Sequence, residues 1–151
     1  MCLGKGISPC PGSVARSSDD VVIVDTTVWV EYFRGRSNVE TDWLDTELDR
    51  QRLGLVDLIL CEVLQGVRDE TAARKVERQL LNLAVFETGG IDLARETARN
   101  YRLLRGRGHT VRKTIDGLIA TFCIREDHSL LHRDRDFDPF EMFLQLSVIH
   151  P

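Results

Sequence analysis

Five acidic residues in this chain stand where a carboxylate could take part in chemistry. Asp25 directly follows the short β-branched run 21–24. Asp134 and Asp136 follow the mainly apolar run 129–132. Both runs have the length and composition of buried strands, so these acids are predicted at strand ends. Because α/β proteins bind ligands at the carboxyl ends of parallel strands, we expect the three acids to lie near one another.

Two further acids lie inside segments that are predicted to be helices. Glu62 interrupts the apolar run 58–64, and Asp116 sits beside an apolar stripe spaced as one helix face. A carboxylate in such a helix turns to solvent or has a partner, because an unpaired buried charge is very costly. Mg²⁺ is the economical partner, since it takes oxygen ligands and needs few direct carboxylates. Such an ion activates a bound water and stabilises the oxyanions formed when a phosphate is attacked.

Each acid alone also has a structural explanation. Asp25 could cap the following helix, and Asp116 could favour a helix N-terminus through the macrodipole. Glu62 could be a solvated helix residue. Asp134 and Asp136 could be turn residues. All of these explanations would have to hold together, with the strand-end placement a coincidence, so we favour a shared divalent-cation site.

The elements that would position these acids alternate along the chain. Strands are expected at 21–24, 53–56, 84–86, 129–132 and 147–149. Helices are expected at 28–33, 40–50, 58–65, 70–81, 92–105, 113–126 and 139–144, the first of them capped by Thr26 or Thr27. This alternation predicts an α/β fold with a mostly parallel central sheet covered by helices on both faces.

Composition narrows the function further. The net charge of −4 argues against a protein that simply coats nucleic acid, because such proteins are usually basic. It leaves room for a nuclease whose acids hold Mg²⁺. No apolar run approaches the roughly 20 residues of a membrane helix, so no membrane association is expected. The four cysteines include no CxxC pair and suit a reducing cytoplasm, and Cys61 and Cys123 are predicted to be buried.

Residues 1–20 differ from the rest of the chain. They contain Gly, Ser and Pro with few large apolar side chains, which is typical of a disordered extension. Lys5 is not followed by the apolar segment of a signal peptide. We therefore expect a single domain over 21–151, with the functional protein starting near Val21 or Val22.

Three motifs in order resemble the PIN-domain toxins of the VapC type. Segment 21–29, VVIVDTTVW, resembles their opening strand; 110–120, TVRKTIDGLIA, their central helix; and 131–137, LHRDRDF, their C-terminal motif. The resemblance implies a three-layer α/β/α sandwich and cleavage of RNA that depends on Mg²⁺ or Mn²⁺ and leaves a 3′-hydroxyl. It also implies a homodimer and a VapB-like antitoxin that inserts a peptide across the site.

The same resemblance implies roles for the acids. Asp25 and Asp116 would bind the metal directly, and Glu62 would complete an acidic triad. Asp134 would be the fourth acid, often reaching the ion through water. Asp136 could share that last role, and the doublet leaves the assignment open.

Other side chains join the predicted site. By resemblance, Thr27 would orient a water or a carboxylate, and Arg112 would hold either the scissile phosphate or an acid. We also expect Arg107 and Arg112 to contact RNA, because their loop leads into Asp116 and phosphate contacts are mostly Arg or Lys. The arginines earlier in the 92–105 segment are expected on a solvated helix face.

An aromatic cluster early in the chain has two possible fates. Trp29, Tyr32 and Phe33 recur at helical spacing. We expect them to pack in the core, with contact to an antitoxin helix or a second subunit as the alternative.

Two other functions compete with a nuclease. A catalytically inactive PIN-like module that binds RNA or protein would lack some of the acids, and here none is missing. An acidic-pocket signalling receiver would need a lysine at a strand end, which the three lysines do not supply. A DxDxT phosphatase is excluded, because that motif is absent at Asp25.

Overall fold

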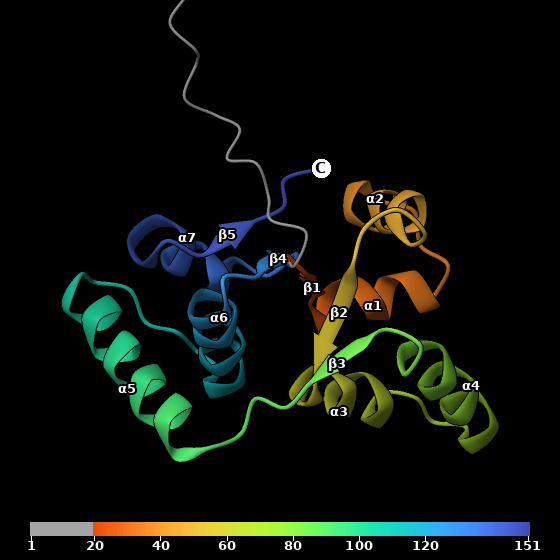
Figure 1. The fold of residues 1–151 in the computed structure, drawn as a ribbon, viewed down its shortest axis with the longest axis horizontal. Helices are drawn as coiled ribbons and strands as arrows, with labels where there is room; N and C mark the ends of the chain where they lie inside the picture. The colour runs from red at the N-terminus through yellow and green to blue at the C-terminus, as the bar shows by residue number, and fades with distance from the viewer. Residues whose placement is uncertain (1–19) are drawn as a thin grey trace, which may run out of the picture.

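The computed structural model describes residues 20–151, which fold into one β-sheet with helices on both faces (Figure 1). The predicted disordered extension over 1–20 lies outside the described residues, except for Asp20. The strands are β1 (Val22–Val24), β2 (Leu53–Val56), β3 (Ala84–Phe86), β4 (Ser129–Leu131) and β5 (Ser147–Val148). The sequence predicted all five, to within one residue at each end.

The strand order is β3-β2-β1-β4-β5, and every neighbouring pair is parallel. β1 lies at the centre, where Val22 pairs with Leu53 of β2 and with Ser129 of β4. The chain runs outward from β1 to β3 and then crosses to β4 on the other side of β1. Strand order therefore reverses between β1 and β4, and the crevice outside their carboxyl ends is the expected ligand site of an open α/β sheet.

Seven α-helices and one 3₁₀ turn connect the strands of the described chain. They are α1 (Thr26–Phe33), α2 (Val39–Glu47), α3 (Asp57–Gln65), α4 (Glu70–Leu80), α5 (Ile91–Gly106), α6 (Thr114–Glu126), the 3₁₀ turn η1 (Arg135–Phe137) and α7 (Asp138–Leu144). Polar caps start three of the α-helices: Asp25 accepts from the Thr27 N–H at α1, Asn38 and Thr41 bond reciprocally at α2, and Asp69 accepts from the Ala72 N–H at α4. Within residues 20–151, none of the helices has the length and apolarity required to cross a bilayer.

Figure 1 shows α5, α6 and α7 on one side of the sheet and α1, α2 and α4 on the other. Helix α5 packs along α6, and α3 packs on α1 and α4. Helix α6 is the most deeply placed, since buried residues lie all around it: Asp116, Gly117, Ile119, Ala120, Thr121, Phe122 and Cys123. The sequence allowed the Asp116 carboxylate either to face solvent or to have a partner. Because Asp116 is buried, it does not face solvent.

Three details differ from the sequence predictions. Helix α1 is capped by Asp25, the alternative that the sequence also allowed, rather than by Thr26 or Thr27, because the Asp25 carboxylate accepts from the Thr27 backbone N–H and starts the helix at Thr26. Cys61 is exposed, because Ile59 and Val63 are the buried residues of α3 and Cys61 lies on the opposite side of the helix. Cys123 is buried as predicted. The turn η1 was not predicted, since three residues leave no periodic pattern.

Candidate active site

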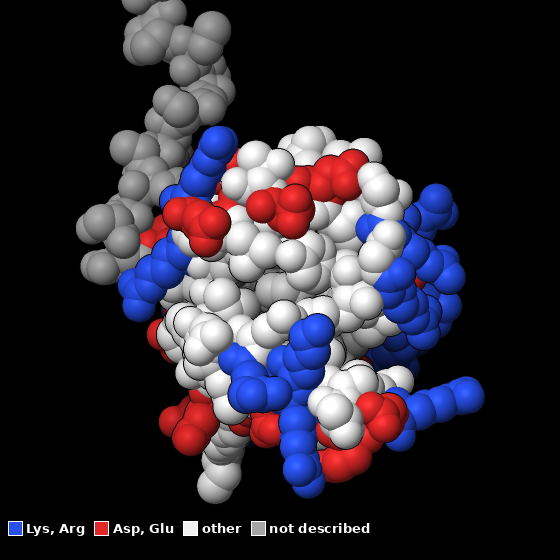
Figure 2. Space-filling model, turned by 90° about the vertical axis from the view of Figure 1, so that its right-hand side faces the viewer, with Lys and Arg blue, Asp and Glu red and all other residues white. Residues whose placement is uncertain are grey.

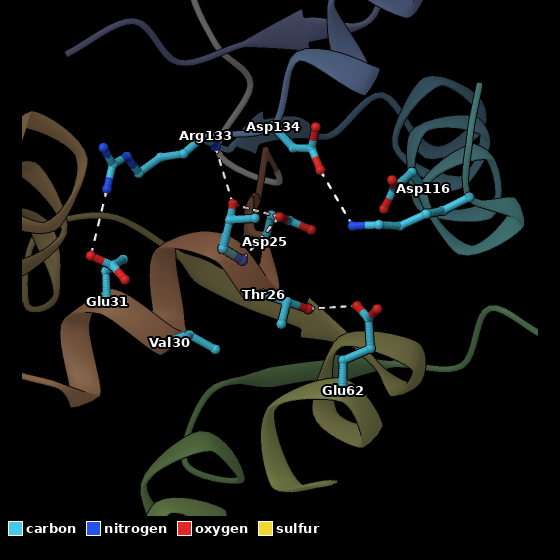
Figure 3. A pocket seen from close by; sticks show the side chains of 10 residues that line it. Asp25, Thr26, Val30, Glu31, Glu62, Asp116, Arg133 and Asp134 are labelled. Atoms are coloured by element: carbon cyan, nitrogen blue, oxygen red, sulfur yellow. Dashed lines mark hydrogen bonds and ion pairs between the residues drawn. The ribbon is translucent and has the colours of Figure 1, made fainter. Parts of the chain in front are cut away.

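A pocket of about 400 Å³ opens at the carboxyl ends of β1 and β4, where the strand order reverses. Helices α1, α3 and α6 form its other walls. Figure 3 shows the carboxylates of Asp25, Glu62, Asp116 and Asp134 around one hollow, with a fifth carboxylate, that of Glu31, paired with Arg133. The other lining residues are Thr26, Thr27, Val30, Glu31, Lys113 and Arg133.

Asp25 is fixed from three directions at the end of β1. Its backbone N–H donates to the Leu131 carbonyl at 2.9 Å, which continues the β1–β4 pairing. Its Oδ2 accepts from the Thr27 hydroxyl at 2.7 Å and from the Thr27 backbone N–H at 3.1 Å. The Thr27 hydroxyl in turn accepts from the Arg133 backbone N–H at 3.1 Å, which fixes its direction. The Asp25 carboxylate is thus held in one orientation.

Burial acts against the charge on Asp25. The residue is only 3% exposed, and desolvation raises the pKa of its carboxyl above the usual value, in spite of the Thr27 hydrogen bonds. The nearby charge of Glu62 adds to the shift. A cation in the pocket would relieve both effects.

Glu62 reaches the pocket from α3. Its Oε2 accepts a 2.7 Å hydrogen bond from the Thr26 hydroxyl, across 36 residues of sequence (Figure 3). Thr26 and Thr27, adjacent at the start of α1, therefore hold different carboxylates, those of Glu62 and Asp25. Two neighbouring side chains place two acids that the sequence keeps far apart.

Asp116 is the pocket acid with a buried carboxylate oxygen that has no hydrogen-bond partner among the described residues. It is 5% exposed, and the oxygen without a partner is Oδ2. Burial, followed by the charge of Asp25, raises the pKa of Asp116 to about 7. A buried carboxylate oxygen without a partner is costly in a folded protein. This oxygen points to a missing partner of positive charge.

The Asp134–Asp136 doublet is divided between two tasks. Asp134 lines the pocket, whereas the carboxylate of Asp136 is held by Arg112, whose Nε lies 3.0 Å from Oδ1 and 3.2 Å from Oδ2. Burial acts to raise the pKa of Asp134, but the Asp136 backbone N–H and the charges of Lys113 and Arg112 outweigh it and hold that pKa below its usual value. Asp134 is therefore the acid of the doublet that faces the hollow as a carboxylate.

The residues present fit a divalent cation. Carboxylate oxygens are the ligands that Mg²⁺ and Mn²⁺ prefer. Ligand atoms of Asp116, Asp134 and Asp136 lie within 4.8 Å of one another. Because Asp136 is already held by Arg112, we regard the acids that line the pocket as the better ligand set. The unpartnered oxygen of Asp116 and the mutual repulsion of the acids are the features that a cation would correct.

The structure places the four predicted acids and Thr27 at the pocket, where Thr27 orients the Asp25 carboxylate, one of its two predicted roles. Three other predicted residues do not line the pocket: Asp136, Arg112 and Arg107. Arg112 holds an acid, which is one of its two predicted roles. The Arg107 guanidinium lies 4.9 Å from the centre of the Phe143 ring. Its contact with RNA stays a prediction.

Sequence reasoning missed several lining residues. Thr26 and Lys113 were not assigned to the site, although Thr26 is adjacent to Asp25 and Lys113 lies three residues before Asp116. Arg133 was also missed; its Nη1 lies 3.8 Å from Glu31 Oε2 and its Nε lies 3.2 Å from Glu40 Oε2 at the rim. Proximity in sequence to a predicted acid was the signal available for Thr26 and Lys113.

Comparisons with known proteins agree with this geometry. A model of the PIN domain matches residues 22–141. VapC ribonuclease Mb1587 of Mycobacterium bovis and ribonuclease VapC11 of Mycobacterium tuberculosis are each 32% identical to this chain over 120 residues, covering 78% of it and 90% of each relative.

Solved structures agree on the fold. VapBC2 from Rickettsia felis, bound to a DNA fragment from its promoter, has a TM-score of 0.68 at 14% identity, covering 85% of this chain and 97% of that one. FitAcB from Neisseria gonorrhoeae has a TM-score of 0.68 at 19% identity, covering 86% of this chain and 97% of that one. At these low identities, the solved structures support the α/β/α architecture and nothing more specific. The family model and the relatives at 32% identity carry the assignment further: this chain belongs to the PIN-domain family, as do the VapC ribonucleases that it resembles.

Proposed function

We propose that this protein is a divalent-metal-dependent endoribonuclease and the toxin of a type II toxin–antitoxin pair. The observation that carries the proposal is the gathering of four carboxylates, from four separate parts of the chain, around one pocket. The relatives at 32% identity are named as VapC ribonucleases, which supports RNA as the substrate. A catalytically inactive PIN-like module that binds RNA or protein is the alternative.

Some pocket residues would bind the metal ion, and others hold these ligands in position. A bound Mg²⁺ or Mn²⁺ would supply Lewis-acid stabilisation of the phosphate oxygens and lower the pKa of a bound water. Asp25 and Asp116 are the residues that we assign to direct ligation, with Glu62 and Asp134 as the outer acids. The Thr27 and Thr26 hydroxyls hold Asp25 and Glu62 in place, so little reorganisation is needed on binding. Cleavage would leave a 3′-hydroxyl and a 5′-phosphate.

A second surface suits a protein partner. A recess of about 460 Å³ between α1, α2 and α4 is lined by Trp29, Tyr32, Phe33, Leu48, Leu80 and Leu83, with polar residues at its edge. Trp29 is buried, as expected for a core residue, whereas Tyr32 and Phe33 are partly exposed. Figure 2 shows the face of α2 and α4, which is largely uncharged at its centre and has both basic and acidic side chains around it. Since the Rickettsia felis and Haemophilus influenzae neighbours are VapBC assemblies, we propose a VapB-like antitoxin as the partner of this recess.

An RNA cleavage assay tests the proposed function. Purified protein is incubated with total RNA in MgCl₂, in MnCl₂ and in EDTA, beside two Asp→Asn variants. Asp25→Asn removes a pocket charge, and Asp127→Asn makes the same change at the exposed left-handed C-cap of α6, where Asn is tolerated. We expect cleavage by the wild type and Asp127→Asn with metal, and none by Asp25→Asn or in EDTA.

Two results would contradict the nuclease. Cleavage that persists in EDTA, or full activity of Asp25→Asn, would remove the metal site from the reaction. RNA binding without cleavage under all metal conditions would favour the inactive module instead.

A further inference from the structure

Lys113 projects into the acidic pocket from the N-cap position of α6, three residues before Asp116. Its Nζ lies 3.5 Å from Asp134 Oδ2, the contact drawn as the dashed line that ends on Asp134 in Figure 3. The charge of Asp116, with smaller contributions from Asp134 and Glu62, raises the pKa of this lysine above its usual value. Lys113 is thus a positive charge inside the ring of acids that we assign to a divalent ion.

The two neighbouring basic residues of this loop are held very differently. The planar guanidinium of Arg112 makes three contacts of 3.0 to 3.2 Å with the Asp136 carboxylate. Within the described chain, the Lys113 side chain makes a single polar contact, at 3.5 Å to Asp134. Both side chains are largely exposed, so the difference between them lies in the number and length of their contacts. Lys113 also lines a second cavity, the groove between α5 and α6. Arg112 is therefore fixed, whereas the ammonium of Lys113 is free to change partners at little cost.

We propose that Lys113 is a catalytic residue: a built-in counter-ion that occupies the acid cluster before the divalent ion binds, then yields the acids to it and contacts the scissile phosphate. This inference rests on the proposed nuclease function. The ammonium and the metal compete for the same carboxylates, above all Asp134 and Asp116. Once the metal neutralises them, the ammonium is left beside a pocket that must receive an anion.

The chemistry of the incoming substrate fits this second role. A phosphodiester brings negative charge to a pocket already lined by acids, and a lysine is a compact positive charge with three donors that binds phosphate well. Donors aimed at charge that develops in the transition state act on the rate of the chemical step. Lys113 should thus raise the rate of cleavage and lower the affinity of the pocket for Mg²⁺.

The matched variants are Lys113→Met and Lys75→Met, since Lys75 is an exposed lysine of α4 that does not line the pocket. The full chain is stripped of metal with EDTA, dialysed and titrated with MgCl₂ by calorimetry in the absence of RNA. Lys113→Met is expected to bind Mg²⁺ about threefold to tenfold more tightly than the wild type, because a competing charge at close range is gone. Its kcat at saturating Mg²⁺ is expected to fall about tenfold or more. Lys75→Met should match the wild type in both.

Lys113→Arg keeps the charge, so its Mg²⁺ affinity should stay close to that of the wild type. The opposite signs of the two effects in Lys113→Met are what a merely structural ion pair would not produce. If Lys113 only supported Asp134, its loss would weaken Mg²⁺ binding and cleavage together, and this result would overturn the proposal. Unchanged Mg²⁺ affinity, or unchanged kcat at saturating Mg²⁺, would overturn it as well.

The wild type separates this inference from the function on which it rests. If the wild type neither binds Mg²⁺ nor cleaves RNA, the proposed function fails and the role of Lys113 fails with it. If the wild type does both and Lys113→Met behaves as Lys75→Met does, only the role of Lys113 is wrong.

Discussion

Arg112 and Asp136 form a two-pronged ion pair that joins the loop before α6 to the turn η1. The guanidinium Nε lies 3.0 and 3.2 Å from the two carboxylate oxygens of Asp136, and an Nη lies 3.0 Å from Oδ1. The backbone N–H of Asp136 then donates to Asp134 Oδ1 at 3.0 Å. The ion pair thus holds the segment that presents Asp134 to the pocket.

The variant Arg112→Ala should lower both stability and cleavage. Asp136 is 8% exposed and loses its partner, while the arginine itself is largely exposed, so we expect a loss of about 1 kcal/mol in the free energy of unfolding. Cleavage should fall because Asp134 is less well placed. Urea unfolding of Arg112→Ala, Asp136→Ala and the double variant measures the coupling. Effects that simply add in the double variant would show that the pair does not act as a unit.

The hydrogen bond from Thr26 to Glu62 gives a second prediction. Thr26→Val keeps the shape of the side chain and removes the hydroxyl that holds Oε2. We expect the single-turnover cleavage rate to fall about fivefold, the equivalent of about 1 kcal/mol for one hydrogen bond, with little change in the melting temperature. Thr26→Ser restores the hydroxyl and should recover most of the rate. A Thr26→Val enzyme as fast as the wild type would mean that Glu62 does not depend on this bond.

The parallel sheet and the meeting of the acids were predictable because they follow from local pattern. Strands buried on both faces are continuous apolar runs, and an acid directly after such a run must lie at the carboxyl edge. Asp25 and Asp134 were placed in this way. Glu62 and Asp116 were found because a carboxylate is out of place in an apolar helix.

What the sequence left open depends on contacts between distant segments. Asp134 and Asp136 both follow β4, and their roles separate only because Arg112 lies within reach of one of them. The role of Lys113 could not be read from the spacing of apolar residues, because Lys113 lies at the N-cap of α6, before the first turn of that helix. The exposure of Cys61 was mispredicted because the apolar run 58–64, about two helical turns, does not reveal which face meets the sheet.

Strand β2 offers a test of the packing behind the site. A Cβ added at Gly54 would lie 2.8 Å from the Ala84 carbonyl oxygen and 2.9 Å from a Val21 methyl group. Because backbone of β3 is on one side, Gly54→Ala should cost about 1 to 3 kcal/mol in the free energy of unfolding. Gly106→Ala is the matched control, since a Cβ there meets nothing within 4 Å, and it should change stability by less than about 1 kcal/mol. Equal chemical denaturation midpoints for the two variants would contradict the close approach of β2 and β3.

The raised pKa of Asp116 predicts how the metal-free protein responds to pH. Its carboxyl has a pKa of about 7 in the folded protein against an ordinary value of 3.8, and burial raises the pKa of Asp25 too. An acid that titrates higher when folded binds more protons in the folded state, so its contribution makes the free energy of unfolding fall as pH rises from about 4 to about 7. His128 and His132 have pKa values lowered by burial, which gives a slope of opposite sign, so the wild type must be compared with Asp116→Asn.

Thermal unfolding in EDTA across this pH range should therefore show the wild type losing stability relative to Asp116→Asn as pH rises. Added Mg²⁺ should reverse the loss, because it binds the carboxylate that the proton leaves, and its stabilising effect should be larger at about pH 8 than at about pH 5.5. The Asp116→Asn protein should gain little from Mg²⁺ at either pH. If the difference in melting temperature between the two proteins stays constant from acid to neutral pH, the pKa of Asp116 is not raised by burial. In that case the burial of Asp116 does not favour the binding of a cation.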